Sequence, residues 1–301
     1  MSGRSGVLVI GDALLDVDVD GRVERTTPDA GLPVLDVTSE VMRPGGAGLA
    51  AALLAADGMP VTLVTALCAD TAGGQLRDLL REPSIEVLAG PGEGGTVVKT
   101  RLAGLARVDR GEGQPASGFG TTVAAPLRAA LCTAAAVLVS DYGRGVAADP
   151  LLRSALTDAL RSGLPVVWDP HPRGPSPVPA VTIATPNLAE ARGVSRHGAA
   201  DVAAREVRRA WSACAVAVTC GAEGAVLIGD GAPELVPAPR VSGGDPCGAG
   251  DAFAGSLAAA LAEGRPRLDA VRCAVHRAAR FVGLGGAGAF AARRAAVGAP
   301  V

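Results

Sequence analysis

Short runs of Val, Leu and Ile alternate along the chain with longer segments rich in Ala and Leu. The apolar runs, bounded by turn residues, predict buried strands at 7–11, 61–67, 135–140, 164–169, 181–185, 215–219 and 225–229. Helical spacing predicts helices at 47–56, 72–81, 151–161, 200–211, 249–262 and 268–283. Strands that are apolar on both faces and alternate with helices indicate an α/β fold, with a mostly parallel sheet covered on both sides.

Two segments break this rhythm, because residues 12–43 and 94–109 alternate charged side chains with Val and Leu. Alternation with a period of two predicts half-exposed strands, so we expect a small second sheet that projects from the main one. Such a sheet would act as a lid over a site or as the contact surface of a homodimer. We expect residues 1–301 to form a single domain, with these two segments as its lid.

Composition narrows the range of partners. The 301 residues carry a formal net charge of −2 without a block of like charge, and aromatic residues make up 2%. These values argue against nucleic acid and anionic membrane surfaces as partners. The apolar runs are too short for a membrane span, and the six cysteines lack a C-x-x-C pair. We expect reduced thiols, no signal peptide and a cytoplasmic location, since the first six residues lead directly into a strand.

Polar clusters follow the predicted strands. They are Gly11-Asp12, Ser140-Asp141, Asp169-Pro170, Thr185-Pro186-Asn187 and Thr219-Cys220-Gly221. Ligands of open parallel sheets bind beyond the carboxyl ends of the strands, so these clusters mark the expected site.

The run S-G-G-D-P-C-G-A-G-D-A-F, residues 242–253, leads into the helix predicted at 249–262. Glycines let the chain turn tightly and expose the first N–H groups of the helix, which bind anions together with the helix dipole. Asp251 lies in the first turn, where the helix N-terminus favours its ionised form. It could accept the proton of a hydroxyl that attacks phosphorus. The alternative interpretation is helix capping, because glycine loops and acids commonly begin helices.

Two other nucleotide-binding motifs do not occur. A P-loop requires G-K-[ST], and the only lysine, Lys99, lies in V-V-K-T. A dinucleotide-binding fold places G-x-G-x-x-G after its first strand, where this chain has V-L-V-I-G-D-A-L-L-D.

The run D-P-C-G-A-G-D resembles the second signature of the PfkB, or ribokinase-like, family of sugar kinases. Further motifs, in order along residues 7–290, are similar to the kinase half of bacterial ADP-heptose synthases: V-L-V-I-G-D-A-L-L-D, G-R-V-E-R-T-T-P-D-A-G-L-P-V-L, R-P-G-G-A, V-S-D-Y-G-R-G, D-P-H-P-R-G and T-P-N-L-A-E. The resemblance implies a three-layer ribokinase-like sandwich with a small projecting β-sheet lid. It also implies ATP-dependent, Mg²⁺-requiring phosphorylation of D-glycero-D-manno-heptose 7-phosphate at the anomeric hydroxyl, a step of ADP-heptose biosynthesis.

The resemblance also implies roles for individual residues. Asp251 would be the catalytic base, and the backbone N–H groups that stabilise the transferred phosphoryl group would come from Gly248, Ala249 and Gly250. The ATP-binding residues would be Asn187, Leu188, Ala189, Glu190, Thr219, Gly221, Gly224 and Asp245, with Glu190 holding Mg²⁺ through water. The residues that bind the sugar or its phosphate would be Asp12, Asp16, Arg43, Gly45, Gly46, Lys99, Asp141 and Arg144. Turn-forming carboxylates, a solvated acid at a helix start and surface salt bridges are the structural alternatives.

The sequence departs from the family pattern at two positions within the motifs. Leu49 stands where the family has Asn, and Pro246 stands where it has Thr. A kinase for another sugar or a nucleoside, and a sensor of sugar phosphates or nucleotides that has lost catalysis, are the alternative functions. The adenylyltransferase motif H-x-G-H does not occur in the sequence, so the adenylyltransferase of the next step would be a separate polypeptide, or there would be none.

Overall fold

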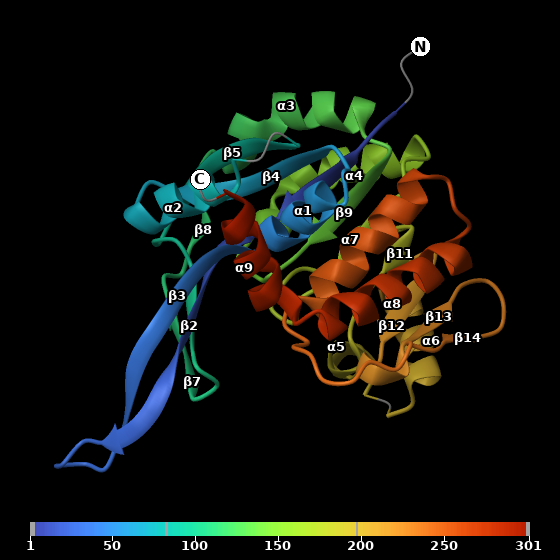
Figure 1. Cartoon of the computed structure of the whole chain (residues 1–301). Coiled ribbons are helices and arrows are strands. Elements are labelled where there is room, and N and C mark those ends of the chain that lie inside the picture. Colours follow the sequence, from blue (N-terminus) through green and yellow to red (C-terminus); the bar gives the residue numbers. More distant parts are fainter. Residues whose placement is uncertain (1–3, 82–83, 197, 299–301) are drawn as a thin grey trace.

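The computed structural model describes residues 4–81, 84–196 and 198–298, and in this part of the chain a ten-stranded sheet forms the centre (Figure 1). The strand order is β14-β13-β12-β11-β10-β9-β1-β4-β5-β8. The bounds are β1 Val7–Gly11, β4 Val61–Cys68, β5 Ile85–Glu93, β8 Gln114–Pro115, β9 Ala136–Ser140, β10 Val166–Asp169, β11 Ile183–Ala184, β12 Val216–Thr219, β13 Ala225–Ile228 and β14 Glu234–Val236. The strands from β12 to β5 run parallel, and β8, β13 and β14 are antiparallel to their neighbours. The predicted mostly parallel sheet is therefore confirmed.

Helices cover both faces of this sheet. Their bounds are α1 Ala47–Ala56, α2 Thr71–Leu79, α3 Phe119–Thr133, α4 Pro150–Arg161, α5 Leu188–Ser195, α6 Ala200–Ala210, α7 Ala249–Ala262, α8 Arg267–Gly283 and α9 Gly286–Gly298. Successive residues of β1 point to opposite faces. Val7 and Val9 pack with α1, α7 and α8, whereas Leu8 and Ile10 pack with α3, α4 and α6. The result is three layers with an apolar core on each side of the sheet.

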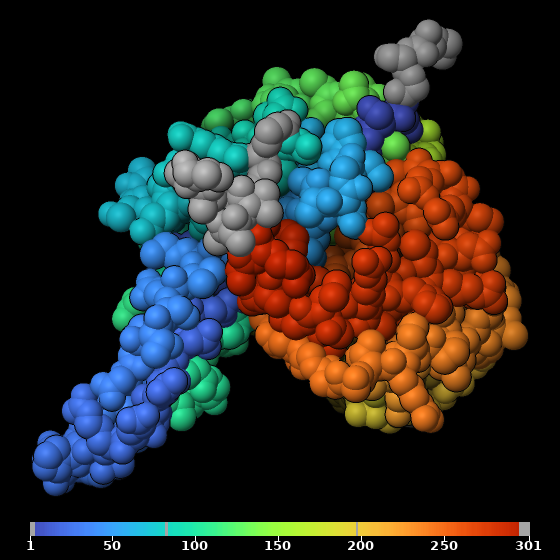
Figure 2. Space-filling view, viewed as in Figure 1, coloured from blue at the N-terminus to red at the C-terminus, as the bar shows by residue number. Residues whose placement is uncertain are grey.

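A second sheet of four strands, in the order β3-β2-β6-β7, projects from this body (Figure 1). Its bounds are β2 Ala13–Thr26, β3 Pro33–Gly46, β6 Val98–Leu102 and β7 Ala106–Arg110. The base of β2 is buried through the side chains of Leu15, Val17 and Val19, whereas the outer half of the strand is exposed. Figure 2 shows the β2–β3 hairpin projecting away from the body. The projecting sheet that the alternating pattern predicts is therefore present.

Within the described ranges, no helix combines the length and apolar character that crossing a lipid bilayer requires.

Candidate active site

The turn before α7 needs glycine at one position. Gly248 has φ 80°, the left-handed region, and a Cβ built there would lie 2.7 Å from Cδ2 of Leu49. The carboxylate of Asp245 accepts a hydrogen bond from the Cys247 N–H (2.9 Å), which tightens the turn. The sequence thus places the start of the helix directly at the candidate site.

One N–H of the predicted anion-binding set is already engaged. Ala249 donates to the carbonyl of Pro246 at 3.0 Å and so closes the turn. The Ala249 N–H thus has a partner within the turn, and its contact with a phosphoryl group stays a prediction. Gly250, on the same turn, is exposed and lines a cavity at the carboxyl ends of the strands.

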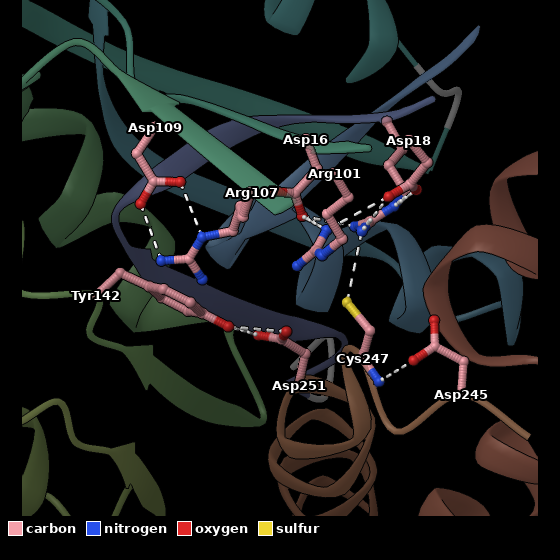
Figure 3. A network of polar contacts seen from close by, with 10 residues as sticks. Asp16, Asp18, Arg101, Arg107, Asp109, Tyr142, Asp245, Cys247 and Asp251 are labelled. Atoms are coloured by element: carbon pink, nitrogen blue, oxygen red, sulfur yellow. Dashed lines mark hydrogen bonds and ion pairs between the residues drawn. The ribbon is translucent and has the colours of Figure 1, made fainter. Parts of the chain in front are cut away.

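Asp251 lies in the first turn of α7 and is only 4% exposed. The hydroxyl of Tyr142 donates to both of its carboxylate oxygens, at 2.9 and 2.8 Å (Figure 3). Burial raises the pKa of Asp251 to about 7, and the hydrogen bond from Tyr142 opposes that rise. Desolvation therefore opposes the ionised form that the helix N-terminus favours.

Asp16 is paired with Arg43 rather than with solvent. Nη1 of Arg43 donates to Oδ2 of Asp16 (2.6 Å), and Nε donates to Oδ2 of Asp18 (2.7 Å). Arg43 is 2% exposed, and the neighbouring carboxylates raise its pKa. Its guanidinium is bound to these carboxylates, and the contact of Arg43 with the sugar phosphate stays a prediction. Oδ1 of Asp16 is buried and has no hydrogen-bond partner among the described residues, which leaves an acceptor for a ligand hydroxyl.

Asp12 holds the loop that follows β9. Its carboxylate accepts hydrogen bonds from the backbone N–H groups of Tyr142 (3.0 Å), Arg144 (3.0 Å) and Val146 (3.1 Å). Burial raises its pKa, and these donors oppose the rise. Both oxygens of Asp12 are thus used within the protein, so its predicted direct contact with the sugar is replaced by a role in shaping the loop.

Gly45 and Gly46 let β3 approach the two carboxylates of β2 and its preceding turn. A Cβ at Gly45 would lie 2.6 Å from Oδ2 of Asp16. At Gly46, where φ is 58°, a Cβ would lie 2.4 Å from the carbonyl oxygen of Asp12. The close approach predicted for these glycines exists, but the atoms they approach belong to the protein.

Lys99 of β6 reaches over the site from the projecting sheet. Its Nζ lies 5.0 Å from the centre of the Tyr142 ring, and burial lowers its pKa. Arg144 lies on the loop after β9. Burial is the largest cause of the lowered pKa of His171, and the charges of Arg173, Lys99 and Arg144 lower it further, in that order. Both predicted cations therefore lie close enough to His171 for their charges to act on its pKa.

Asp141 directly follows β9 and is 3% exposed. Its Oδ1 accepts from the Gly143 N–H (2.7 Å), whereas Oδ2 is buried without a partner among the residues described. Burial raises its pKa to about 7. A cavity of about 170 Å³ adjoins it at the strand ends.

The predicted N-x-x-E pair begins α5 at this cavity. The side chain of Asn187 accepts from the Glu190 N–H (3.0 Å), and the Glu190 carboxylate accepts from the Asn187 N–H (2.9 Å). This capping box is the structural alternative to a nucleotide role, yet both residues also line the cavity together with Thr219. Leu188 and Ala189 form the first turn of α5.

The remaining predicted nucleotide residues lie outside the lining of that cavity. Gly221 and Gly224 flank the short helical turn after β12, where Gly224 approaches the carbonyl oxygen of Val236. Asp245 closes the turn before α7.

Several site residues were missed by sequence reasoning. Tyr142 and His171 line the same cavity beside Asp169, which belongs to one of the predicted polar clusters, and Arg101 of β6 pairs with Asp16 (3.6 Å) and Asp18 (3.4 Å). The available signal for Tyr142 was position, since it follows a predicted strand.

The cavity fits a hydrated Mg²⁺ that carries nucleotide phosphates. Three carboxylates, those of Asp141, Asp169 and Glu190, line it, and burial is the largest cause of the raised pKa of each. Mg²⁺ prefers oxygen ligands and keeps several waters. The described residues contain no group of three or more His, Cys, Asp or Glu side chains that could hold a metal ion directly.

The geometry defines a class of protein. A buried carboxylate lies beside an anion-binding helix start, at the strand ends of a three-layer α/β fold and beneath a projecting sheet. These are the parts of a phosphotransferase that acts on an alcohol.

The comparisons with known proteins give the family. Residues 116–293 match the pfkB family of carbohydrate kinases. The chain is 44% identical over 298 residues to bifunctional protein HldE of Streptomyces coelicolor, and 37% identical over 284 residues to that of Caulobacter sp.. The chain belongs to the pfkB family of carbohydrate kinases, whose members use ATP with Mg²⁺.

These alignments cover 95% and 89% of the chain but only 62% and 57% of the two relatives, so the chain spans about three fifths of their length. Among solved structures, it is similar to phosphofructokinase-2 of Escherichia coli in complex with fructose-6-phosphate (TM-score 0.70, 17% identity, 97% of both chains). It is also similar to Arabidopsis thaliana ribokinase complexed with ribose and ATP (TM-score 0.67, 19% identity, 94% of both chains). The predicted ribokinase-like fold is confirmed.

The departure at Leu49 has a structural explanation. Its side chain is 2% exposed and packs beneath the turn before α7, in a cluster with Ala252, Phe281 and Phe290. Leu49 therefore supports Gly248 from below, where an Asn would lack a polar partner in the cluster.

Proposed function

We propose that this kinase phosphorylates D-glycero-D-manno-heptose 7-phosphate at its anomeric hydroxyl. The observation that carries the proposal is the position of Asp251, buried in the first turn of α7 beside the Gly248–Gly250 turn. The motif resemblance along residues 7–290 and the 44% identity to an HldE protein support the choice of sugar.

The protein's own residues divide the work of the transfer. Asp251 accepts the proton of the attacking hydroxyl, so that the new O–P bond forms as the bond to the leaving ADP oxygen breaks. The turn at Gly248 and Gly250 offers its N–H groups to the migrating phosphoryl oxygens. Mg²⁺, held through water at Glu190, would neutralise charge on the phosphates of ATP.

Sugar recognition is assigned to the base of the projecting sheet. The unpartnered Oδ1 of Asp16 accepts a hydrogen bond from a sugar hydroxyl, and Arg43 fixes the orientation of that carboxylate. Lys99 and Arg144 supply positive charge for the 7-phosphate, since a phosphorylated sugar requires cations close to its site.

The test is a substrate panel with ATP and Mg²⁺, in which the heptose 7-phosphate is compared with unphosphorylated heptose, ribose and fructose 6-phosphate. We expect an anomeric phosphate by ³¹P NMR only with the heptose 7-phosphate. Asp251→Asn should fold and bind ATP but lose about three powers of ten in kcat. Asp78→Asn, exposed on α2, is the matched control and should keep the parent kcat. Equal turnover of an unphosphorylated sugar would contradict the choice of substrate.

We also propose that two copies associate through the projecting sheet. Its described strands and turns expose large apolar side chains at Val23, Leu32, Val37, Leu105 and Val108. Light scattering should give a dimer mass, and Val37→Lys with Leu105→Lys should give a monomer. An adenylyltransferase would then use the anomeric phosphate.

A further inference from the structure

Tyr142 is the single tyrosine of the sequence and it contacts the proposed catalytic base directly. It follows β9, and its hydroxyl lies 2.9 Å from Oδ1 and 2.8 Å from Oδ2 of Asp251 (Figure 3). A phenol has one proton to donate, so this proton is shared between both carboxylate oxygens. The contact fixes the plane of the carboxylate that would receive the proton of the sugar.

The tyrosine is itself held by neighbours from separate parts of the chain. Its backbone N–H donates to Oδ2 of Asp12 (3.0 Å). Nζ of Lys99 lies over the ring, and the ring of His171 stacks on it at 6.4 Å between centroids with an interplanar angle of 24°. A Cβ at Gly46 would lie 3.2 Å from Cδ2 of the tyrosine, so the glycine leaves room for the ring. Such support fixes the position of the phenolic oxygen before any ligand binds.

We propose that Tyr142 is a positioning residue for phosphoryl transfer, whose hydroxyl keeps the Asp251 carboxylate oriented and ionised until the sugar hydroxyl takes over one of its two oxygens. This inference rests on the proposed role of Asp251 as the base. Tyr142 does not exchange its own proton with the sugar, because burial and the adjacent Asp251 charge raise its pKa well above its usual value.

The other charges around Asp251 act in both directions. The pKa of Asp251 responds to charges on three other strands, namely Asp16 of β2, Arg43 of β3 and Lys99 of β6. The charge of Asp251 in turn raises the pKa of Asp169 of β10. Asp16 raises the pKa of Asp251, and Lys99 and Arg43 lower it, whereas Tyr142 is the largest lowering influence. Removing the phenolic hydroxyl alone should therefore shift the balance toward the protonated, inactive acid.

Tyr142→Phe tests this because it keeps the ring beneath Lys99 and against His171. A hydrogen bond to a charged group is strong enough to move the acid limb of the kcat profile up by about 1 pH unit. We expect kcat to fall about tenfold at pH 6.5 and to stay within about twofold of the parent at pH 9, with KM for the sugar unchanged within about twofold. A deficit that is the same at every pH, or one confined to KM, would overturn the proposal.

A double-mutant cycle tests whether the tyrosine acts through Asp251. In the Asp251→Asn background, Tyr142→Phe should change the residual kcat by less than about twofold, because the group on which it acts has gone. Full additivity of the two effects would show that Tyr142 acts elsewhere.

A second measurement does not depend on activity. Because the chain has one tyrosine, ¹³Cζ-tyrosine labelling gives a single NMR resonance, and the pH titration of Asp251 should move it with a midpoint of about 7. The step should vanish in Asp251→Asn and persist in Asp78→Asn. A tyrosine chemical shift that does not change across the titration of Asp251 would overturn the proposal for Tyr142. If the step is present but no sugar is phosphorylated, the proposed function fails while the Tyr142–Asp251 coupling stands.

Discussion

Nη1 of Arg43 lies 2.6 Å from Oδ2 of Asp16, and the side chains are only 2% and 7% exposed. The pair joins the two long strands of the projecting sheet, because Asp16 of β2 lies opposite Arg43 of β3 in their register. A buried ion pair contributes little net stability, but each partner depends on the other, because a lone buried charge is costly.

Arg43→Met should therefore destabilise the protein by about 3 kcal/mol, since it removes the nearer counterion of the buried Asp16 and leaves only Arg101 at 3.6 Å. Chemical unfolding at pH 7.5 measures this change. The matched control is Arg25→Met in the same hairpin, which breaks an exposed pair with Asp36 (3.0 Å) and should cost less than about 1 kcal/mol. Equal losses for the two variants would contradict the dependence on burial.

The capping box at α5 allows its structural and metal-binding roles to be separated. Glu190→Gln keeps a side-chain acceptor for the Asn187 N–H but removes the charge, whereas Glu190→Ala removes both. We expect Glu190→Gln to unfold within about 0.5 kcal/mol of the parent, and Glu190→Ala to lose about 1 kcal/mol. Both should need several times more Mg²⁺ for half-maximal activity. If both variants keep the Mg²⁺ requirement of the parent, capping of α5 is the only role left for Glu190.

Much of the fold was predictable because the apolar pattern is local. The helices predicted at 47–56 and 249–262 match α1 and α7 residue for residue, since a glycine precedes each of them and an apolar stretch fills each. The strands that were predicted also lie within one to two residues of the observed ones at most of their ends.

The missed elements contain residues that usually break regular structure. Helix α3 carries Pro126 in its interior, and its stripe of Val123, Leu127 and Leu131 against the sheet outweighs the lost N–H. Strand β5 contains Gly90 and Pro91, two residue types that are uncommon in strands. Gly90 is needed there because Cδ2 of Phe119 lies 2.4 Å from where its Cβ would be, a contact that no local pattern shows.

The site was predictable in its parts but not in its pairings. Strand ends placed Asp12 and Asp141 at one edge of the main sheet, whereas Asp16 lies within β2 of the projecting sheet. Which carboxylate binds a backbone loop, which binds Arg43 and which keeps a free oxygen depends on contacts between distant segments, such as the 109 residues that separate Tyr142 from Asp251. Chain spacing alone carries no information on these choices.

Gly45 offers a test of sugar recognition that leaves the charges intact. In Gly45→Ala the new methyl group would meet Oδ2 of Asp16 at 2.6 Å, and Arg43 holds that carboxylate in place. We expect KM for the sugar to rise about tenfold, KM for ATP to stay within about twofold, and stability to fall by about 1–3 kcal/mol. Gly74→Ala in α2 is the control, because its Cβ meets no neighbouring described atom within 4 Å. That variant should gain about 0.5–1 kcal/mol from helix propensity and keep both KM values.

The raised pKa of Asp251 makes a prediction about stability as well as catalysis. Its pKa is about 7 in the folded protein against an ordinary value of 3.8, so between these values the native state holds a proton that the unfolded chain has released. The contribution of this residue to stability therefore falls as the pH rises from about 4 to about 7, and the full penalty is present above pH 7.

Asp251→Asn removes that titration. The variant should be more stable than the parent by roughly 1–4 kcal/mol at pH 8, and within about 0.5 kcal/mol of it at pH 4. Urea unfolding across this range measures the difference, and Asp78→Asn should leave the pH dependence of the parent unchanged. A variant that is less stable than the parent at pH 8 would mean that the ionised carboxylate is well compensated by Tyr142, Lys99 and Arg43, and that burial does not govern its protonation. A stabilised variant that barely turns over would show that this site retains a costly buried acid for catalysis at the expense of stability.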